Sequence, residues 1–140
     1  MNIQLAETDS EIERCFPVMV QLRPKLTAAD FVVRVRRQFQ QGGYRLAYLE
    51  DDKQIKALAG FRISEMLFSG KFLYVDDLIT DSESRSKGYG AALFDWLINY
   101  ARSEGCEQFE LDSGVQRAGA HRFYFSKRME IPSYHFSLKL

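Results

Sequence analysis

The feature that most constrains the fold is a strand-like segment that passes through a basic, glycine-bearing turn into a helix-like segment. Residues 72–80 are largely apolar, and residues 88–103 carry apolar side chains on a wide face beside a polar stripe. The turn between them reads Arg85-Ser86-Lys87-Gly88-Tyr89-Gly90-Ala91. Glycines let a backbone approach a ligand closely, and the first amides of a helix have no intrahelical acceptor and favour anions. The turn therefore predicts a phosphate-binding site.

The rest of the chain predicts a continuous series of elements without linkers or repeats. Strands are expected at 2–6, 44–50, 55–68, 72–80, 107–112 and 131–140, and helices from Thr8-Asp9 to about 22, from Thr27 to Gly42-Gly43, over 88–103 and over 116–125. This order, β-α-α-β-β-β-α-β-α-β, predicts an α/β fold with a mixed sheet and helices on both faces. A length of 140 residues fits one domain spanning 1–140.

Composition excludes several classes of protein. Hydrophobic residues make up 46% of the chain, so disorder is not expected. The 19 basic residues are balanced by 19 acidic ones, which argues against a protein whose main function is to bind the nucleic acid backbone. No apolar run approaches the ~20 residues of a membrane span, and no signal sequence opens the chain. Cys15 and Cys106 show neither metal-ligand spacing nor a disulfide framework. We expect a cytoplasmic protein without a metal or a membrane partner.

Two adjacent carboxylates interrupt the strand at 72–80. Asp76 and Asp77 follow an apolar run, and neighbouring side chains of a regular strand point to opposite faces. Burying either carboxylate without a partner would cost several kcal/mol. A cleft or a β-bulge at this point would let at least one of them reach solvent or a ligand. The alternative is an aspartate that caps a helix or tethers a loop.

The layout Arg-x-x-Gly-x-Gly/Ala after a strand resembles the pyrophosphate loop of the GCN5-related N-acetyltransferases, and the order of elements resembles their fold. The resemblance implies a sheet splayed between the fourth and fifth strands, with acetyl-coenzyme A in the gap as co-substrate. Its pyrophosphate would bind Arg85, Ser86, Lys87, Gly88, Tyr89, Gly90 and Ala91, and its pantetheine amides would pair with Leu78, Ile79 and Thr80.

The resemblance also implies catalytic residues. Asp76-Asp77-Leu78 resembles the Glu-Asp-hydrophobic run of polyamine-type members, in which an acidic pair faces the acceptor amine; either aspartate could take the amine's proton. Tyr124 stands where the family has a tyrosine that protonates the leaving thiolate; its alternative is packing against the sheet. His121 shares the helix face of Tyr124 and is either structural or a further contact.

The chain departs from the family pattern at three places, of which the first is Ser82, where the family usually has Pro three residues before the arginine. Arg117 stands where the family often has Asn, and it could meet a coenzyme phosphate. Arg128-Met129 replaces Gly-Phe; if the turn needs a positive φ, Arg128 carries a penalty of roughly 1 kcal/mol.

The leading functional hypothesis is an acetyl-coenzyme A-dependent transfer of an acetyl group to a primary amine by direct attack in a ternary complex. The aspartates favour a small cationic acceptor, and similar proteins often form homodimers. A non-catalytic coenzyme A sensor and a protein or peptide acetyltransferase remain alternatives, whereas P-loop and dinucleotide-binding motifs are absent. Basic residues at Arg23, Lys25, Arg34, Arg36 and Arg37 form either a solvated face or a basic rim over the acceptor site.

Overall fold

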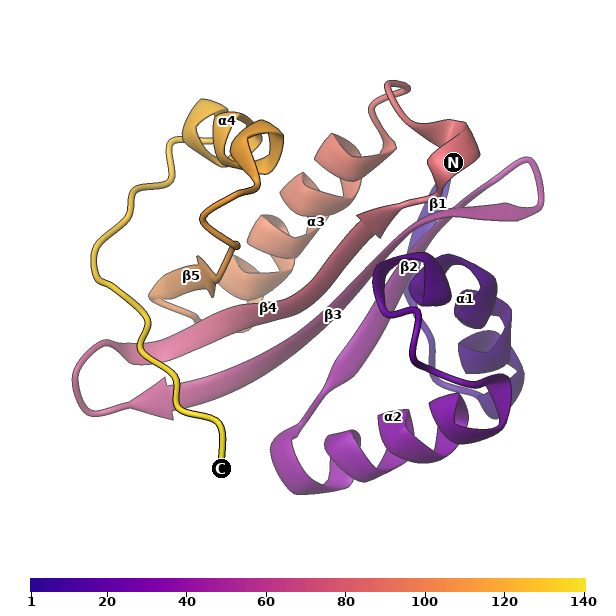
Figure 1. Cartoon of the computed structure of the whole chain (residues 1–140), viewed down its shortest axis with the longest axis horizontal. Coiled ribbons are helices and arrows are strands. Elements are labelled where there is room, and N and C mark those ends of the chain that lie inside the picture. Colours follow the sequence, from indigo (N-terminus) through magenta and orange to yellow (C-terminus); the bar gives the residue numbers. More distant parts are fainter. The chain divides into compact units, whose positions relative to one another are not determined.

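A computed structural model describes all 140 residues, which divide into two compact units, Met1–Glu110 and Leu111–Leu140. The first unit is built on a five-stranded sheet in the order β1-β2-β3-β4-β5 (Figure 1). Its strands are β1 (Asn2–Leu5), β2 (Arg45–Asp51), β3 (Gln54–Met66), β4 (Gly70–Thr80) and β5 (Gln108–Leu111). Neighbours from β1 to β4 are antiparallel, and β5 is parallel to β4 after a crossover through a helix. The mixed sheet predicted from the sequence is confirmed.

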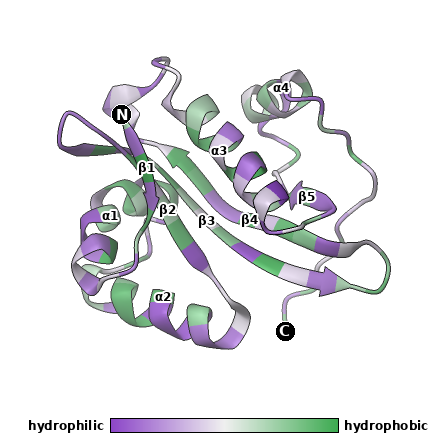
Figure 2. Ribbon diagram, turned by 180° about the vertical axis from the view of Figure 1, so that it is seen from behind, coloured by the Kyte–Doolittle hydropathy of each residue, from purple (hydrophilic) through white to green (hydrophobic).

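The helices of the first unit begin and end where the sequence signals predict. In α1 (Asp9–Leu22), Thr8 and Glu11 form a capping box that satisfies backbone amides at the helix start. In α2 (Ala28–Gly42), the Thr27 hydroxyl accepts from the amide of Asp30, and Gly43 ends the helix in the left-handed conformation. Figure 2 shows hydrophobic and hydrophilic residues along α2, as expected of a helix with one buried face.

Helices cover both faces of this sheet. Figure 1 shows α1 and α2 on one side and α3 (Tyr89–Ser103) on the other. On the α1 and α2 side, Ile12, Met19 and Phe31 pack with residues of β2 and β3 into a buried core. On the α3 side, the ring of Tyr100 meets that of Phe61 edge-on at 5.4 Å between centroids. The middle of the sheet is therefore buried between two helical layers.

The second unit contains one helix, α4 (Ala118–Ser126). Arg128 adopts a φ of 66°, so the strained turn expected after this helix is confirmed. The strand expected over residues 131–140 is wrong: the segment has no strand structure, and Phe136 and Leu138 are 92% and 85% exposed. Its alternating apolar residues indicate a strand, but a strand also needs a neighbour for its backbone groups. No strand follows β5 to supply that neighbour.

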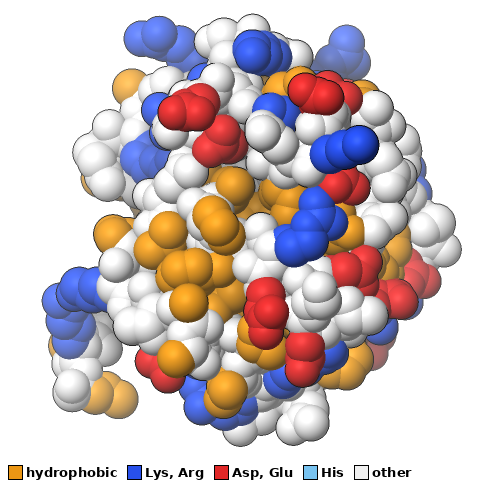
Figure 3. Space-filling view, turned by 90° about the vertical axis from the view of Figure 1, so that its right-hand side faces the viewer, with side chains coloured by type: hydrophobic (Ala, Val, Ile, Leu, Met, Phe, Trp, Pro, Cys, Tyr) orange, Lys and Arg blue, Asp and Glu red, His pale blue; other side chains and the backbone are white.

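No helix has the length and apolar character that crossing a membrane would require. On the face shown in Figure 3, acidic and basic side chains lie interspersed with apolar ones, in keeping with the balanced composition.

Candidate active site

The two aspartates of β4 lie at a β-bulge. Gly60 of β3 pairs with Asp77, whereas the next residue, Phe61, pairs with Val75, so Asp76 is an extra residue with no partner on β3. A bulge of this kind turns two consecutive side chains toward one face of a sheet. Both aspartates line the same cavity as a result. The local opening of the strand that the sequence predicts is thus confirmed.

Asp77 is held by three donors. The Tyr44 hydroxyl donates to Oδ2 at 2.8 Å, and Arg23 approaches Oδ1 with Nε at 2.9 Å and with Nη2 at 2.8 Å. Tyr44 is 3% exposed, and burial followed by the nearby Asp77 charge raises the pKa of its hydroxyl well above the usual value. The phenol is therefore a fixed hydrogen-bond donor, and it sets the position of the Asp77 carboxylate.

Gly60 makes this arrangement possible. A Cβ at residue 60 would lie 1.9 Å from the Tyr44 hydroxyl oxygen and 2.6 Å from Oδ2 of Asp77. Both distances are far below van der Waals contact, and the two atoms belong to a fixed, buried pair. The glycine that interrupts β3 in the sequence thus leaves room for the Tyr44–Asp77 hydrogen bond.

Asp76 is bound from the neighbouring strand. Arg62 reaches Oδ2 with Nε at 2.9 Å and with Nη2 at 2.8 Å, and Arg23 donates to the backbone carbonyl of Asp76 at 3.0 Å. The Asp76 side chain is only 19% exposed. Burial raises the pKa of this carboxyl above its ordinary value, and the hydrogen bond from Arg62 lowers it in part. Asp76 is therefore a better proton acceptor than a solvated aspartate.

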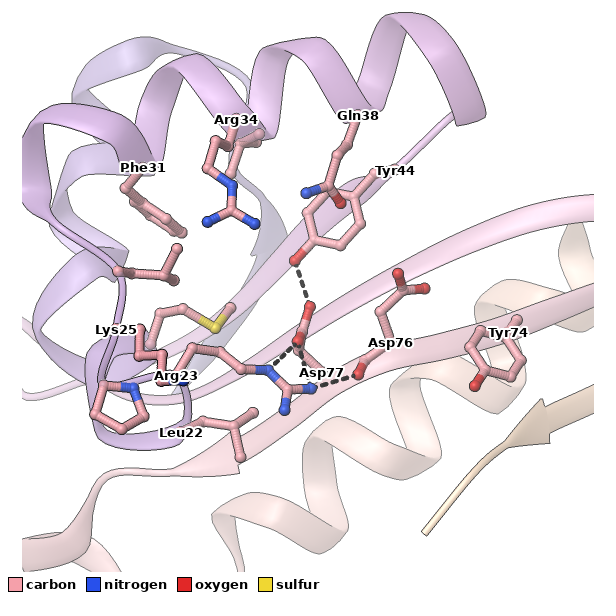
Figure 4. A pocket seen from close by; sticks show the side chains of 14 residues that line it. Leu22, Arg23, Lys25, Phe31, Arg34, Gln38, Tyr44, Tyr74, Asp76 and Asp77 are labelled. Atoms are coloured by element: carbon pink, nitrogen blue, oxygen red, sulfur yellow. Dashed lines mark hydrogen bonds and ion pairs between the residues drawn. The ribbon is translucent and has the colours of Figure 1, made fainter. Parts of the chain in front are cut away.

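The aspartates form part of the wall of a cavity of about 630 Å³, drawn in Figure 4. This volume lies in the range of small-molecule sites. Its walls come from the end of α1, the following loop, α2 and β4, so the first two helices shape it. The lining residues are Met19, Leu22, Arg23, Pro24, Lys25, Leu26, Phe31, Arg34, Val35, Gln38, Tyr44, Tyr74, Asp76 and Asp77.

The glycine-bearing turn leads from β4 into α3. Gly88 occupies the N-cap position with a φ of 83°, and the first hydrogen bond of the helix runs from the amide of Ala92 to the carbonyl of Gly88 at 3.0 Å. The amides of Tyr89, Gly90 and Ala91 therefore precede the helical ladder and lie at its positive end.

Side chains of the turn also suit an anion. Arg85 and Lys87 are exposed and form no ion pair or side-chain hydrogen bond, and Ser86 between them has a φ of 65°. A Cβ at Gly90 would lie 2.9 Å from the Thr80 hydroxyl oxygen, so the helix start packs closely on the end of β4. The residues present fit the diphosphate of coenzyme A, as the sequence predicts.

Tyr89 has a structural contact that the sequence does not reveal. Its hydroxyl donates to Asp51, the last residue of β2, at 2.7 Å. The side chain is therefore engaged, and Tyr89 can offer its backbone amide to a ligand. This contact fixes the start of α3 against the β2–β3 hairpin.

The end of β4 has one edge that β5 does not cover. Leu78, Ile79 and Thr80 pair with β3 on one side. On the other side, the amide just before β5, that of Glu107, donates to Lys71 at 2.7 Å, close to the start of β4. With four residues against eleven, β5 ends before it can reach Leu78. Pairing of the pantetheine amides with Leu78, Ile79 and Thr80 would need an edge that β5 leaves uncovered, and it stays a prediction.

Arg117 and Tyr124 belong to the second unit. Arg117 is the N-cap residue of α4, and Tyr124 lies seven residues further on the same helix. Burial raises the pKa of the Tyr124 hydroxyl, and the positive charge of Arg117 lowers it in part. The ring nitrogen of His121 lies 2.8 Å from the carbonyl oxygen of Gly114, which gives this histidine a structural contact. The relation of Arg117 and Tyr124 to the aspartates stays a prediction.

Three residues of the site are missed by sequence reasoning about function: Tyr44, Gly60 and Arg62. Tyr44 and Gly60 stand 33 and 17 positions from Asp77, and Arg62 stands 14 positions from Asp76. Gly60 carried a signal, because a glycine inside a strand often marks a bulge or a close approach. Tyr44 and Arg62 carried none, since a tyrosine and an arginine in strand segments are ordinary.

Comparison with known proteins agrees with this geometry. The model of the Acetyltransferase (GNAT) family matches residues 6–129. The chain is 37% identical over 137 residues, covering 97% of itself and 96% of the relative, to a Bacillus subtilis (strain 168) protein named uncharacterized N-acetyltransferase YhdJ. The fold of these 140 residues and the match along them define a GNAT acetyltransferase.

Solved structures show the same fold. A putative acetyltransferase from Agrobacterium tumefaciens str. C58 aligns with a TM-score of 0.85 at 18% identity, covering all of both chains. AAC(6')-Iy, in complex with the bisubstrate analog CoA-S-monomethyl-acetylneamine, aligns with a TM-score of 0.85 at 11% identity, covering 99% of this chain and 97% of that one. The chain belongs to the GNAT family of N-acetyltransferases, and its family transfers acetyl groups from acetyl-coenzyme A.

Proposed function

We propose that the chain transfers an acetyl group from acetyl-coenzyme A to a primary amine bound in the cavity beside Asp76 and Asp77. The observation that carries this proposal is the course of β4. Its bulge presents two carboxylates to a cavity, its next residues have a backbone edge that β5 does not cover, and its end leads into a turn whose amides precede the helical ladder. One strand thereby connects an acceptor site to a site for the acetyl donor.

The turn and the edge of β4 would bind the donor. Amides of Tyr89, Gly90 and Ala91, with Lys87 and Arg85 nearby, would hold the diphosphate, and the backbone of Leu78–Thr80 would orient the pantetheine arm. Acetyl-coenzyme A supplies an activated thioester. Because the acyl group is already activated, alignment of the two reactants accounts for much of the rate.

The aspartates would manage the proton of the amine. An amine attacks only when it is neutral, whereas alkylamines are mostly protonated near pH 7, so a base is required. We assign that role to Asp76, since its pKa is raised by burial, and a positioning role to Asp77, which Tyr44 and Arg23 hold. Tyr124 is our candidate for protonating the leaving thiolate.

The experiment follows thiol release from acetyl-coenzyme A over a panel of primary amines, together with calorimetric titration of coenzyme A. The wild-type protein should bind coenzyme A and release thiol with at least one amine. Tyr124→Phe should keep that affinity and lose turnover by about 10²-fold or more. Binding without turnover on any amine, and no effect of Tyr124→Phe, would instead support the coenzyme A sensor.

A homodimer is part of the same proposal. Phe136, Leu138 and Leu140 alternate along an exposed segment without strand partners. Such a segment can add to a strand of a second copy, because a paired backbone satisfies its polar groups. Sedimentation of the full chain and of a chain ending at Glu130 tests this: the full chain should be dimeric and the shortened one monomeric. A monomeric full chain would exclude it.

A further inference from the structure

Two cations of the cavity have no partner. Arg23 lines the cavity but is bound to Asp77 and to the carbonyl of Asp76, and Arg62 is bound to Asp76. Lys25 and Arg34 also line it, yet neither side chain forms a hydrogen bond or an ion pair. Each carboxylate of the cavity is already paired with an arginine, Asp77 with Arg23 and Asp76 with Arg62. The positive charges of Lys25 and Arg34 are therefore not balanced by a carboxylate of the cavity.

Arg34 is directed at the cavity by its place on α2. It follows Phe31 by three residues and precedes Gln38 by four, and all three line the cavity. Figure 4 shows its guanidinium extending from α2 into the space beside Phe31 and Tyr44. Asp30, one turn earlier on the helix, forms no ion pair with it. Arg37 does not line the cavity, and exposure to solvent accounts for a charged residue at that position. Exposure to solvent does not account for the orientation of Arg34 toward the cavity.

The charge distribution opposes a polycationic acceptor. A second ammonium group would meet Lys25 and Arg34, and it would find Asp76 and Asp77 neutralised by Arg62 and Arg23. An anionic group would instead be attracted by the unpaired positive charges of Lys25 and Arg34. A guanidinium presents parallel N–H donors that match the two oxygens of a carboxylate or phosphate.

We propose that the acceptor is a primary amine that also carries a carboxylate or phosphate group, which Arg34 binds with Lys25 beside it while the amino group lies toward Asp76. This inference rests on the acetyl transfer proposed above and names its substrate class. An amino acid has this combination of groups at the scale of a cavity of about 630 Å³.

The test compares matched acceptors. Thiol release is measured with phenylalanine and phenylalanine amide, with glutamate and glutamine, and with phosphoethanolamine and ethanolamine; spermidine serves as the polycation. Equilibrium binding of the same compounds to the coenzyme A-saturated protein is measured by calorimetry. Changing an acid to an amide also changes the reactivity of the amine. Each acid-to-amide preference is therefore compared between protein variants, so that intrinsic reactivity cancels.

Arg34→Gln is the decisive variant and Arg37→Gln its control, because both remove one charge from the exposed side of α2 and only the first lines the cavity. Arg34→Gln should reduce the preference for anionic acceptors by about 10- to 100-fold, the effect of a charged hydrogen bond. Lys25→Gln should reduce it less, and Arg37→Gln should leave it unchanged. Equal thermal midpoints of the variants would establish that folding is intact.

The outcomes separate this inference from the proposed function. Turnover confined to amides or spermidine, or equal preferences in Arg34→Gln and Arg37→Gln, would overturn the inference while acetyl transfer stands. Tight binding of the acids, weakened by Arg34→Gln, without turnover on any amine would support an anion site at Arg34 and reject acetyl transfer to these amines. The carboxylate and phosphate pairs show which anion is preferred.

Discussion

The Tyr44 hydroxyl donates a 2.8 Å hydrogen bond to Asp77 directly above Gly60, where a Cβ would lie 1.9 Å from the donor oxygen. The position of one candidate catalytic carboxylate thus depends on the absence of a side chain on the neighbouring strand. Glycine here is required by space, whereas Gly88 and Gly105 are required by positive φ.

Gly60→Ala should therefore destabilise the protein by about 2–4 kcal/mol, because it displaces a buried tyrosine and deprives the Asp77 carboxylate of its tyrosine donor. Urea unfolding followed by far-UV circular dichroism measures this. Gly119→Ala in α4 is the control: nothing lies within 4 Å of the added Cβ, and alanine favours a helix. A loss below about 0.5 kcal/mol for Gly60→Ala is the size expected of a neutral surface substitution. Such a result would contradict the close packing of Gly60 against Tyr44 and Asp77.

The proposed base predicts a pH profile. Asp76→Asn should lower kcat/KM by roughly 10²- to 10⁴-fold, as expected for the loss of a general base. In the wild type, kcat/KM should rise with pH as the Asp76 carboxyl loses its proton, with a midpoint above the ordinary pKa of 3.8. Arg62 lowers that pKa, so Arg62→Gln should move the midpoint to higher pH.

Lys53→Gln provides the control for Arg62→Gln, since it removes a positive charge that forms no ion pair and lies in the β2–β3 turn. Its midpoint should equal that of the wild type. A shift of the Arg62→Gln midpoint toward lower pH would reject Asp76 as the titrating group.

Glu11 predicts how stability depends on pH. Hydrogen bonds from the backbone amides of Thr8 and Glu7 lower the pKa of the Glu11 carboxyl from 4.5 to about 2. A pKa depressed in the folded state stabilises the protein above the unfolded pKa of 4.5, and this contribution is lost as pH falls from 4.5 toward 2.

Glu11→Gln should consequently unfold at lower urea concentration than the wild type at pH 7, and the two midpoints should converge between pH 4.5 and 2. Glu13→Gln, on the same helix but outside the capping box, is the control for removing a charge without removing these hydrogen bonds. Parallel curves for Glu11→Gln and wild type over this range would refute the role of the capping box.

The phosphate-binding turn can be tested with two glycines that share a backbone conformation. Gly88 and Gly105 flank α3 with φ values of 83° and 77°, and neither has an atom within 4 Å of an added Cβ. Replacing either with alanine should cost about 1 kcal/mol of stability. Only Gly88→Ala should also weaken coenzyme A binding, by about 5-fold or more, which corresponds to roughly 1 kcal/mol. Equal affinities in the two variants, measured by calorimetry, would place the diphosphate elsewhere.

The elements of this fold were predictable because their signals are local. Thr8, Thr27 and Gly43 act within one helical turn, and the pair of aspartates in an apolar strand indicated the bulge from its own composition. The partners of Asp76 and Asp77 were not predictable, because they come from distant segments. Arg23 reaches the aspartates from the end of α1, and the pairing of β2, β3 and β4 brings Tyr44 and Arg62 to them.

The strand predicted after residue 130 is wrong for a related reason. Alternation at Phe136, Leu138 and Leu140 indicates strand propensity, but a strand is a property of two segments. A pattern within one segment cannot specify its neighbour.

The bulge at Asp76 changes which side chains of β4 point to each face of the sheet, because it inserts one extra residue. Before it, the even-numbered Tyr74 lines the cavity; after it, the odd-numbered Asp77 does, and Ile79 packs against the core on the side of α1 and α2. Deleting one residue here would turn Ile79 to the opposite face and exchange the sides of everything up to Thr80. Designs that borrow this scaffold should therefore keep the number of residues between Val75 and Gly88 fixed, even where they change the residues themselves.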